Sequence, residues 1–310
     1  MSVEPVLVVT GASGPVGRHL LAAAQGRYRL RVLTHQPGAH FETDVEATVW
    51  NPAQAAAGNE RERDRIARVL SGATALVNLA GAPTTAGRLG AAHKKRVVAS
   101  RVDSAQALLH AYHRAEQPPR VWVQASATGY YGDAGETVLT EASPKDDALF
   151  FADVCKAWEA AAEDAGGARL VLARIGIVLA RDAPGWEKLL QTVRFRVGVY
   201  GDGQQWWSWL DADDLAAALL FLVENETSRG VYNLTAPEPV RQGELVRGVA
   251  QRLGVPQLVA TPAAVLRLAT GGLADNVLLP SAKVLPSRLL AEGFEFRCPD
   301  IDTELEKLLE

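Results

Sequence analysis

The sequence contains little cysteine and no cysteine pair of the kind that binds metals. Its two cysteines, Cys155 and Cys298, lie far apart, and neither belongs to a Cys-x-x-Cys motif. This argues against a disulfide framework or a zinc site and fits a reducing, cytoplasmic compartment. The six histidines are scattered without metal-ligand spacing, so we expect no metal site.

An excess of charge of one sign is also lacking. Lysine and arginine number 32 against 36 aspartates and glutamates, which gives a net charge of −4. Nucleic-acid binding favours a basic excess, so we do not expect nucleic acid as a partner. The basic residues between 61 and 68 alternate with acidic ones and predict a solvated helix face.

Long hydrophobic runs are absent as well. No apolar run approaches the roughly 20 residues that a membrane-spanning helix requires. The run 6–9 near the N-terminus is too short for the core of a signal peptide. A chain of 310 residues that is 48% hydrophobic can form one large domain, or one large domain with a smaller one.

Strand and helix patterns alternate over the first 174 residues. Apolar runs that predict buried strands lie at 6–10, 30–34, 75–79, 121–125 and 170–174, with a short strand at 48–50. Helical spacing lies between them at 14–24, 61–70, 94–114 and 151–164. This alternation predicts an α/β fold with a doubly wound, mostly parallel sheet of the Rossmann type.

The rhythm changes after residue 174. Helices are expected at 186–197 and 213–224, a loop at 198–203 and a strand at 231–234, and Asp213 and Asp214 are interpreted as N-terminal capping residues. We expect a dinucleotide-binding domain of residues 1–180 and about 205–236. A smaller mixed domain for the substrate would comprise about 181–204 and 237–310.

A glycine-rich loop lies between the first strand and the first helix. Gly11, Gly14 and Gly17 give the spacing GxxGxxG, and Pro15 suits the first position of the helix. Gly11 would allow a tight turn, Gly14 a close approach to a pyrophosphate, and Gly17 close packing of helix on strand. The loop therefore predicts a dinucleotide site, although a glycine turn without a ligand has the same spacing.

The end of the second strand favours NADP(H) over NAD(H). An acidic residue there would hold the ribose 2′-hydroxyl of NAD, but the sequence reads Thr34-His35-Gln36. His35 or Gln36 could donate to a 2′-phosphate. The alternatives that stay open are NAD(H) as cofactor and His35 as an ordinary surface histidine.

Residues 10–17 resemble the TGxxGxxG loop of the extended, sugar-nucleotide-epimerase-like branch of the short-chain dehydrogenase/reductase superfamily. Further segments are similar to motifs of an atypical family in it, labelled epimerase family protein, with a C-terminal domain of unknown function. They are 78–81 (NLAG), 126–132 (SATGYYG), 155–161 (CKAWEAA), 201–215 (GDGQQWWSWLDADDL) and 233–237 (NLTAP). The resemblance covers nearly the whole chain.

The resemblance implies a set of cofactor-binding residues. Around the pyrophosphate it places Gly11, Ser13, Gly14, Pro15, Val16 and Gly17. His35 and Gln36 stand where members of the family often carry Arg or Lys. The remaining positions, from the ribose to the nicotinamide, are Leu79, Ala80, Gly81, Arg101, Lys156, Ile175, Ile177 and Val178.

The catalytic motif implied by the resemblance is incomplete. Reductases of the superfamily use a Tyr with a Lys four residues later, and a Ser that polarises the substrate carbonyl. Ser126 and Lys156 match, but Ala152 stands in the place of the Tyr. Either a tyrosine just past Ser126, with Tyr131 as the candidate, supplies the proton, or the chemistry is lost and Lys156 only binds ribose.

Two functions follow from this reading. The first is an NADP(H)-dependent oxidoreductase or epimerase acting on a small polar, carbonyl or sugar-nucleotide substrate. The second is an NADP(H)-binding sensor or regulatory protein without turnover. Trp206, Trp207 and Trp209 would form either a substrate wall or a domain interface. A homodimer through the helix 94–114 is expected by analogy only.

Overall fold

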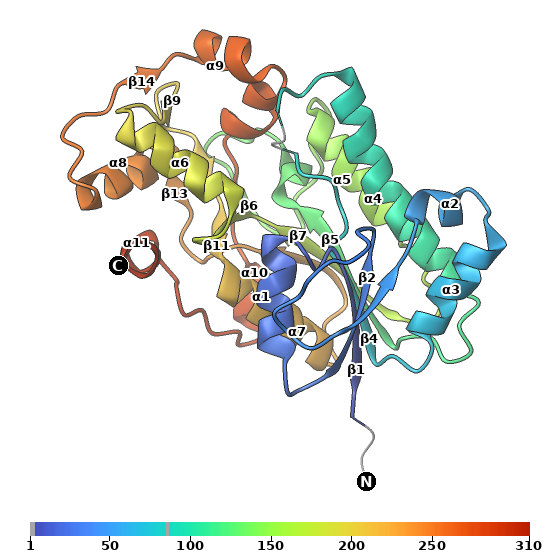
Figure 1. Ribbon diagram of the computed structural model, residues 1–310. Coiled ribbons are helices and arrows are strands. Elements are labelled where there is room, and N and C mark those ends of the chain that lie inside the picture. Colours follow the sequence, from blue (N-terminus) through green and yellow to red (C-terminus); the bar gives the residue numbers. More distant parts are fainter. Residues whose placement is uncertain (1–3, 85–86) are drawn as a thin grey trace.

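A seven-stranded parallel sheet forms the centre of the computed structural model, which describes residues 4–84 and 87–310 (Figure 1). Its strand order is β12-β7-β5-β4-β1-β2-β3, and every neighbouring pair is parallel. The strands are β1 (Val6–Thr10), β2 (Arg29–Thr34), β3 (Glu46–Val49), β4 (Ala75–Asn78), β5 (Val121–Ala127), β7 (Arg169–Ile175) and β12 (Gly230–Leu234). The predicted Rossmann-type fold class is confirmed.

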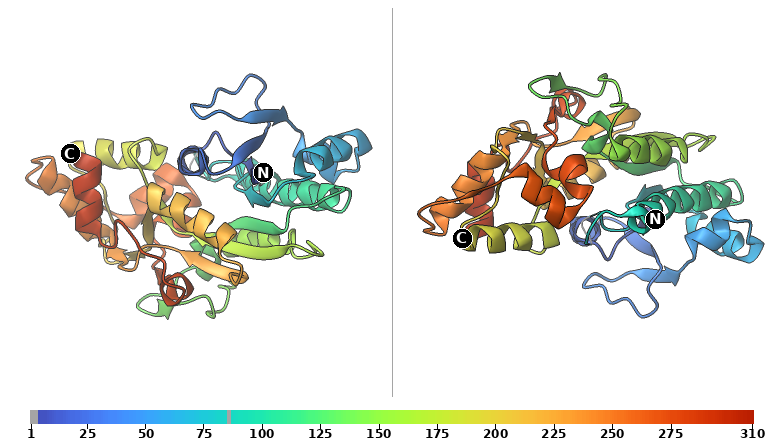
Figure 2. Two further views of the ribbon diagram at one scale, coloured as in Figure 1. Left: turned by 90° about the horizontal axis from the view of Figure 1, so that it is seen from below. Right: turned by 90° about the horizontal axis from the view of Figure 1, so that it is seen from above.

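Helices cover both faces of the sheet because alternate residues of its strands are apolar on each side. Leu7 and Val9 of β1 pack in one core with α1 (Pro15–Ala24) and α7 (Ala212–Glu224). Val6 and Val8 pack in a second core on the opposite face. That face is covered by α2 (Pro52–Ala56), α3 (Glu60–Leu70), α4 (Ala91–Tyr112) and α5 (Phe150–Ala160), as the views in Figure 2 also show.

The C-terminal part of the chain lies over the carboxyl ends of the strands (Figure 1). Its helices are α6 (Pro184–Arg194), α8 (Gln242–Arg252), α9 (Ala263–Thr270), α10 (Ser287–Ala291) and α11 (Ile301–Leu309), with a π-helical turn, η2 (Ala274–Leu278). In open α/β sheets, ligands bind in the crevice at the carboxyl ends of the parallel strands. The helices α6 and α8 share the core of α1 and α7, and the division into two domains stays a prediction.

Short strand pairs link this C-terminal part to the rest of the chain. They are β8 (Ile177–Leu179) with β11 (Trp209–Asp211), β9 (Val199–Tyr200) with β14 (Ala260–Thr261), β10 (Trp206–Trp207) with β13 (Val240–Arg241), and β6 (Val138–Leu139) with β15 (Lys283–Val284). A 3₁₀ turn, η1 (Thr128–Tyr131), follows β5. The segment 198–203, expected to be a loop, contains β9, because a partner distant in sequence supplies its pairing. No described helix is long and apolar enough to cross a membrane.

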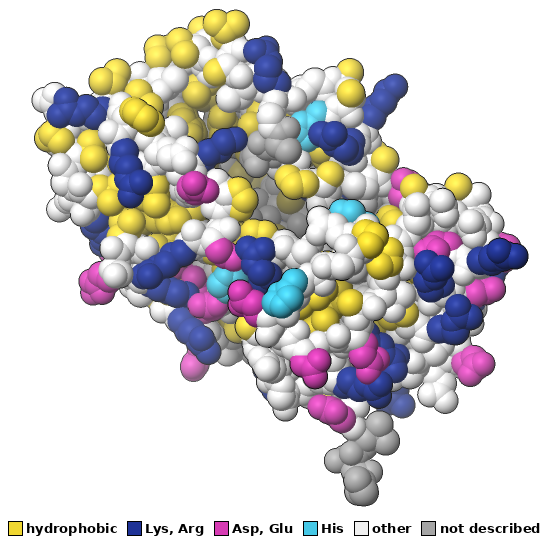
Figure 3. Space-filling model, viewed as in Figure 1, with side chains coloured by type: hydrophobic (Ala, Val, Ile, Leu, Met, Phe, Trp, Pro, Cys, Tyr) yellow, Lys and Arg dark blue, Asp and Glu magenta, His cyan; other side chains and the backbone are white. Residues whose placement is uncertain are grey.

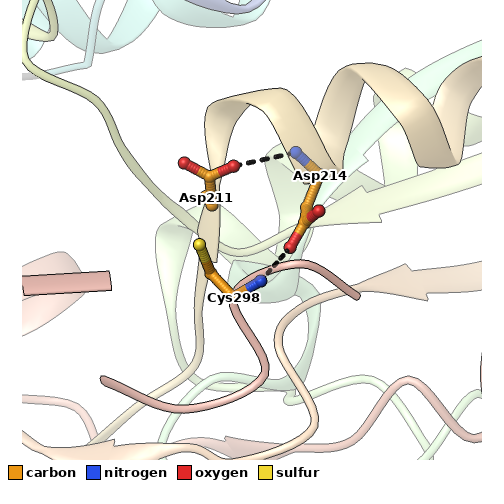
Figure 4. Close-up of side chains that lie close together, drawn as sticks. All are labelled: Asp211, Asp214 and Cys298. Atoms are coloured by element: carbon orange, nitrogen blue, oxygen red, sulfur yellow. Dashed lines mark hydrogen bonds between the residues drawn. The ribbon is translucent and has the colours of Figure 1, made fainter. Parts of the chain in front are cut away.

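The N-terminus of α7 is capped by Asp211, and the interpretation of Asp213 and Asp214 as capping residues is wrong. The Asp211 carboxylate accepts from the backbone N–H of Asp213 at 3.0 Å. It also accepts from the backbone N–H of Asp214 at 2.9 Å, the bond drawn in Figure 4. Asp214 instead accepts from the backbone N–H groups of Arg297 and Cys298, the latter at 2.9 Å. Side chains at the start of α7 therefore hold the C-terminal segment in place.

A second set of contacts joins α11 to the start of α7. The Lys307 ammonium donates to Asp211 at 2.6 Å and to Asp213 at 2.7 Å. Glu304, one turn earlier on α11, is fully buried beside Cys298 and Asp211. Neither of its carboxylate oxygens has a hydrogen-bond partner among the described residues. Burial, followed by repulsion from Asp211, raises the pKa of Glu304 to about 8.

This burial predicts a pH-dependent stability that Glu304→Gln removes. The pKa of Glu304 is about 8 in the folded protein against 4.5 for the free side chain. Between these values the folded state holds the additional proton, so the free energy of unfolding falls as pH rises. One such proton changes the folding constant by up to about tenfold per pH unit.

Urea unfolding at pH values from 5 to about 8.5 measures this slope. The neutral amide of Glu304→Gln flattens it and makes the variant more stable than the wild type at the upper end. Glu306→Gln, at an exposed position of the same helix, is the matched control and keeps the wild-type slope. An unchanged slope in Glu304→Gln would contradict the assignment.

Candidate functional site

The glycine loop joins β1 to α1 at the carboxyl edge of the sheet. Gly11 has a φ of +67°, and a Cβ there would lie 2.6 Å from the carbonyl oxygen of Leu79. At Gly17 a Cβ would lie 2.5 Å from the Gly11 carbonyl oxygen and from Cα of Ala12. Glycine is therefore required at both positions by neighbouring backbone. The helix packs closely on the loop itself, whereas we had expected it to pack on the strand.

The start of α1 offers unpaired backbone donors. Pro15 is its first residue, and Gly14 before it makes no capping side-chain bond. The N–H groups of the first turn consequently have no side-chain acceptor in residues 4–84 and 87–310, and the helix dipole adds partial positive charge there. Such a terminus beside a glycine turn fits the diphosphate of a nucleotide.

A ladder of buried polar side chains supports the turn next to this loop. The Thr10 hydroxyl donates to Asn78 Oδ1 at 2.6 Å, and the Asn78 amide donates to Gln124 Oε1 at 2.9 Å. The Ala80 N–H donates to both Thr10 and Asn78 at 3.2 Å. These contacts fix the turn 79–81 beside Gly11. The sequence analysis gave these side chains no role, although each is a polar residue near the end of an apolar strand.

The predicted specificity residues follow β2, the strand beside β1. His35 and Gln36 are exposed, and the backbone N–H of Gln36 donates to the Thr34 hydroxyl at 3.2 Å. Neither side chain forms a hydrogen bond within the described residues, so both are free to meet a ligand. Their role in binding a 2′-phosphate stays a prediction.

A buried network of hydrogen bonds lies at the carboxyl ends of β5, β7 and β12. The Ser126 hydroxyl donates to Glu159 Oε1 at 2.6 Å, and Arg174 grips both oxygens of Glu159 at 2.9 Å. Arg174 Nη1 also donates to the Tyr131 hydroxyl at 3.0 Å, which donates to Asn233 Oδ1 at 2.7 Å. The network joins segments that the sequence analysis had noted separately. It had missed the roles of Glu159 and Arg174.

The same network determines the surroundings of Tyr130 and Tyr131. Tyr131 is buried, and its burial raises the pKa of its hydroxyl, with the Arg174 charge acting in the opposite direction. Tyr130 is partly exposed, and the Arg174 guanidinium lies 3.4 Å from its ring centre. Tyr131 therefore reaches Ser126 through Arg174 and Glu159, and its predicted role as proton donor stays untested.

Cys155 and Lys156 lie on different faces of α5. Lys156 is exposed and makes no hydrogen bond or ion pair within the described residues. Cys155 is buried instead, with its Sγ 3.5 Å from the Ala127 carbonyl oxygen and next to Ser126. Phe151 lies one turn before Cys155 on this buried face. The side chain of α5 next to Ser126 is thus that of Cys155, while Ala152 in the place of the Tyr, four residues before Lys156, stays as inferred from the motif.

Burial keeps this thiol protonated. Burial first, and then the charge of Glu159, raise the pKa of Cys155 to about 11. A thiol in this state is neither a nucleophile nor a cation. The position that faces Ser126 therefore carries no positive charge from α5, and a role for Lys156 in ribose binding stays a prediction.

The remaining predicted cofactor residues lie around the same edge. Ile175, Ile177 and Val178 are partly buried at the end of β7 and in β8, where Gly176 donates to Leu234 O at 3.0 Å. The surface in Figure 3 is hollowed between the part that carries the sheet and the C-terminal part, and hydrophobic side chains gather along it. This hollow lies over the carboxyl ends of the strands, as a ligand site in this fold requires.

The three tryptophans do not form one wall. Trp209 is buried in the core and its indole N–H donates to Glu238 O at 3.0 Å. Trp206 donates to Glu136 at 2.9 Å, with Arg241 over its ring, and Trp207 packs on the core. The alternatives were a substrate wall and a domain interface; Trp207 and Trp209 pack between segments of the chain, as in the second.

One group of side chains in the described residues has metal-ligating types, namely Asp211, Asp214 and Cys298 (Figure 4). Both carboxylates already accept backbone N–H groups, and Asp211 also accepts from Lys307. We therefore interpret this group as a structural tie between α7 and the C-terminal segment.

Comparisons with known proteins agree with this geometry. The model of the NAD-dependent epimerase/dehydratase family matches residues 7–165 and 179–235, and a domain of unknown function, DUF1731, matches residues 261–308. An epimerase family protein of Staphylococcus aureus (strain bovine RF122 / ET3-1) is 31% identical over 306 residues, covering 97% of this chain and 98% of that protein. One from Staphylococcus epidermidis (strain ATCC 12228 / FDA PCI 1200) is also 31% identical over 306 residues, with the same coverage, 97% and 98%.

Two solved structures are similar over nearly the whole chain. Human epimerase family protein SDR39U1 (isoform 2), crystallised with NADPH, has a TM-score of 0.84, 28% identity and 98% coverage of both chains. A nucleoside-diphosphate sugar epimerase of Corynebacterium glutamicum has a TM-score of 0.73 and 29% identity, covering 98% of this chain and 58% of that one.

The glycine loop makes a direct prediction on stability. Gly17→Ala places a methyl group 2.5 Å from backbone atoms that cannot move freely. We expect it to lower the free energy of unfolding by about 1–3 kcal/mol, measured in urea. Gly185→Ala, in the first turn of α6 with open space around it, is the control and leaves stability unchanged or slightly higher. Equal effects of the two substitutions would refute this packing argument.

The buried ion pair between Glu159 and Arg174 makes a second prediction on stability. Glu159→Leu leaves the Arg174 guanidinium buried without a counter-charge, which we expect to destabilise the protein by about 3–5 kcal/mol. The double variant Glu159→Leu/Arg174→Met removes both charges and recovers most of the loss. Asp302→Asn, at an exposed pair with Arg252, serves as the control and changes stability by about 1 kcal/mol or less. The account fails if the double variant is no more stable than Glu159→Leu.

Proposed function

The chain belongs to the NAD-dependent epimerase/dehydratase family, and from this premise we propose that it is an NADP(H)-binding enzyme acting on a small polar, carbonyl or sugar-nucleotide substrate. The observation that carries the proposal is the glycine loop before the uncapped start of α1. It lies beside the turn 79–81, at the carboxyl edge of a parallel sheet, where the free N–H groups suit a diphosphate.

The proposed cofactor site extends along this edge. Residues 11–17 would hold the diphosphate, and the turn 79–81 would lie beside the adenosine ribose. Ile175, Ile177 and Val178 would flank the nicotinamide, since they lie at the carboxyl end of β7 and in β8 directly after it. When bound, the cofactor supplies the hydride; the chain's own residues bind it, orient it and restrict water.

NADP(H) is proposed over NAD(H) because the end of β2 has no carboxylate. His35 and Gln36 are exposed with free side chains, and neither would repel a 2′-phosphate. The human relative crystallised with NADPH supports the same choice. A small molecule is the proposed substrate.

For catalysis we propose Ser126 as the residue nearest the substrate. Its hydroxyl is held by Glu159, which Arg174 holds in turn, so its position is fixed by two elements distant in sequence. Tyr131 is the candidate proton source at the other end of the same network. Loss of turnover in Ser126→Ala, with NADPH affinity unchanged, would support this assignment.

A second function is favoured by α5. Phe151 and Cys155 lie on the face of α5 that is turned toward Ser126. Phe151 has no acidic proton, and burial raises the pKa of Cys155 to about 11, so this face offers no side chain of the kind that the superfamily's reductases use as proton donor. An NADP(H)-binding sensor without turnover would need no such group. Oxidation of bound NADPH by a carbonyl compound, or reduction of bound NADP⁺ by a sugar nucleotide, lost in Ser126→Ala, would exclude the sensor. If no such compound changes the redox state of the bound cofactor in either direction, the sensor is favoured.

The cofactor choice is tested by fluorescence titration with NADPH and NADH. We expect the wild type to bind NADPH more tightly. His35→Asp places a carboxylate at the 2′-position and should weaken NADPH binding about tenfold or more, which is about 1.4 kcal/mol, while NADH binding is kept or improved. The control is His113→Asp, which makes the same charge change at the C-terminal end of α4, away from this edge.

Either of two results would count against the proposal. Equal affinity for both nucleotides, unchanged in His35→Asp, would mean that His35 and Gln36 do not read the phosphate. Absence of binding to either nucleotide would overturn the cofactor site itself.

A further inference from the structure

The hydroxyl proton of Ser126 already has an acceptor within the chain. Ser126 Oγ lies 2.6 Å from Oε1 of Glu159, and Arg174 donates to that same oxygen from Nε and to Oε2 from Nη2, each at 2.9 Å. A carboxylate held by two nitrogens of a guanidinium is ionised and has no proton to give. Ser126 must therefore be the donor of this short bond, and Glu159 its acceptor.

The lone pairs of Ser126 Oγ, in contrast, have no partner. The neighbouring Cys155 of α5 gives its thiol proton to the Ala127 carbonyl oxygen, 3.5 Å from its Sγ. No residue in 4–84 or 87–310 donates a hydrogen bond to Ser126 Oγ, and Ser126 is only 3% exposed. A buried acceptor without a donor costs free energy, which a donor group of a ligand would recover.

This polarity of Ser126 is the reverse of the one that the superfamily motif implies, in which the serine donates to a substrate carbonyl oxygen. For Ser126 to do so, its proton would have to leave Glu159, whose Oε1 would keep only the donor from Arg174. Hydrogen bonds to a charged group are about twice as strong as neutral ones, so this exchange is unfavourable. A ligand hydroxyl that donates to Ser126 Oγ avoids the exchange altogether.

We propose that Glu159 is a positioning residue that makes Ser126 a hydrogen-bond acceptor, and that the ligand group bound at Ser126 is a hydroxyl and not a carbonyl. This inference deepens the proposed function and, where it concerns the substrate, rests on it. It selects polar molecules with a free hydroxyl, and the alcohol as the bound member of an alcohol and carbonyl pair. A carbonyl oxygen at the same place would face a second acceptor.

Propan-2-ol and acetone are the probes for the test, because they match in size and differ in the hydrogen-bond donor. Crystals of the protein without nucleotide are soaked in a concentration series of each probe. In the wild type we expect propan-2-ol within hydrogen-bond distance of Ser126 Oγ, with a half-saturating concentration about tenfold or more below that of acetone. Ser126→Ala should lose this preference, because it removes the acceptor.

Glu159→Gln keeps the size of the side chain and inverts its polarity toward Ser126. The amide oxygen would accept from Arg174, and the amide nitrogen would donate to Ser126 Oγ, which frees the serine proton for a carbonyl oxygen. We therefore expect the preference to reverse in favour of acetone, whereas a merely structural role for Glu159 would weaken both probes alike. Asp153→Asn, at an exposed position of the same helix, is the matched control and keeps the wild-type preference.

The proposal is overturned if the wild type takes acetone at Ser126 as readily as propan-2-ol, or if neither probe reaches Ser126 Oγ. It is also overturned if Glu159→Gln, shown to be folded by thermal unfolding, keeps the preference for propan-2-ol. Should that variant not fold, the wild type and Ser126→Ala decide the outcome. Because the crystals hold no nucleotide, a wild type that shows the preference but binds neither NADPH nor NADH refutes the proposed function and leaves the acceptor role of Ser126 standing.

Discussion

The ion pair between Glu159 and Arg174 connects the parts of the structure on which the candidate site depends. Glu159 comes from α5 and Arg174 from β7, and through Ser126, Tyr131 and Asn233 they also engage β5, η1 and β12. A buried pair of this kind adds little net stability by itself, but every partner is fixed by geometry once the pair exists. The strand ends at this edge thereby obtain one arrangement.

The C-terminal segment is held by contacts of a similar kind at a second place. Asp211 and Asp214 bind α11 and the chain before it, through Lys307 and through backbone N–H groups. Ser208 binds Val284 N–H and the Ala282 carbonyl oxygen near the π-helical turn. The motif 201–215, noted for its resemblance, thus contributes mainly to holding the C-terminal segment, which covers the strand ends. The hollow of Figure 3 lies between this C-terminal segment and the part that carries the sheet.

The two halves of the site differ in how their charges are neutralised. On the Ser126 side, Arg174 has its carboxylate within the chain, and the neighbouring thiol of Cys155 is uncharged. On the side of the glycine loop, the start of α1 and Arg101 carry positive charge, and no described carboxylate pairs with either of them. This asymmetry is the one expected of a site that receives an anionic ligand on one side and does its polar chemistry on the other.

The sequence by itself determined the fold class and the place of the glycine loop. Alternation of apolar runs with helical spacing is a local property, and the strand beginning at Val6 and the helix after Gly14 follow from nearby residues alone. Gly11 and Gly17 were identified because a turn with positive φ or a close backbone contact admits no other residue. The motif segments near Ser126 and Asn233 were recognised too, but not their contacts.

Only the tertiary structure decided which side chains meet. Neighbouring residues on a helix point about 100° apart, so the face of α5 turned toward β5 determines that Cys155, and not Lys156, lies beside Ser126. Spacing shows which residues share a face, but the packing partner chooses the face. The capping of α7 by Asp211 and the partners of Glu159 depend likewise on segments distant in sequence. Arg101 was named from its motif, yet only the tertiary structure shows that it lies between Gly81 and Trp158 and donates to the Ala82 carbonyl oxygen.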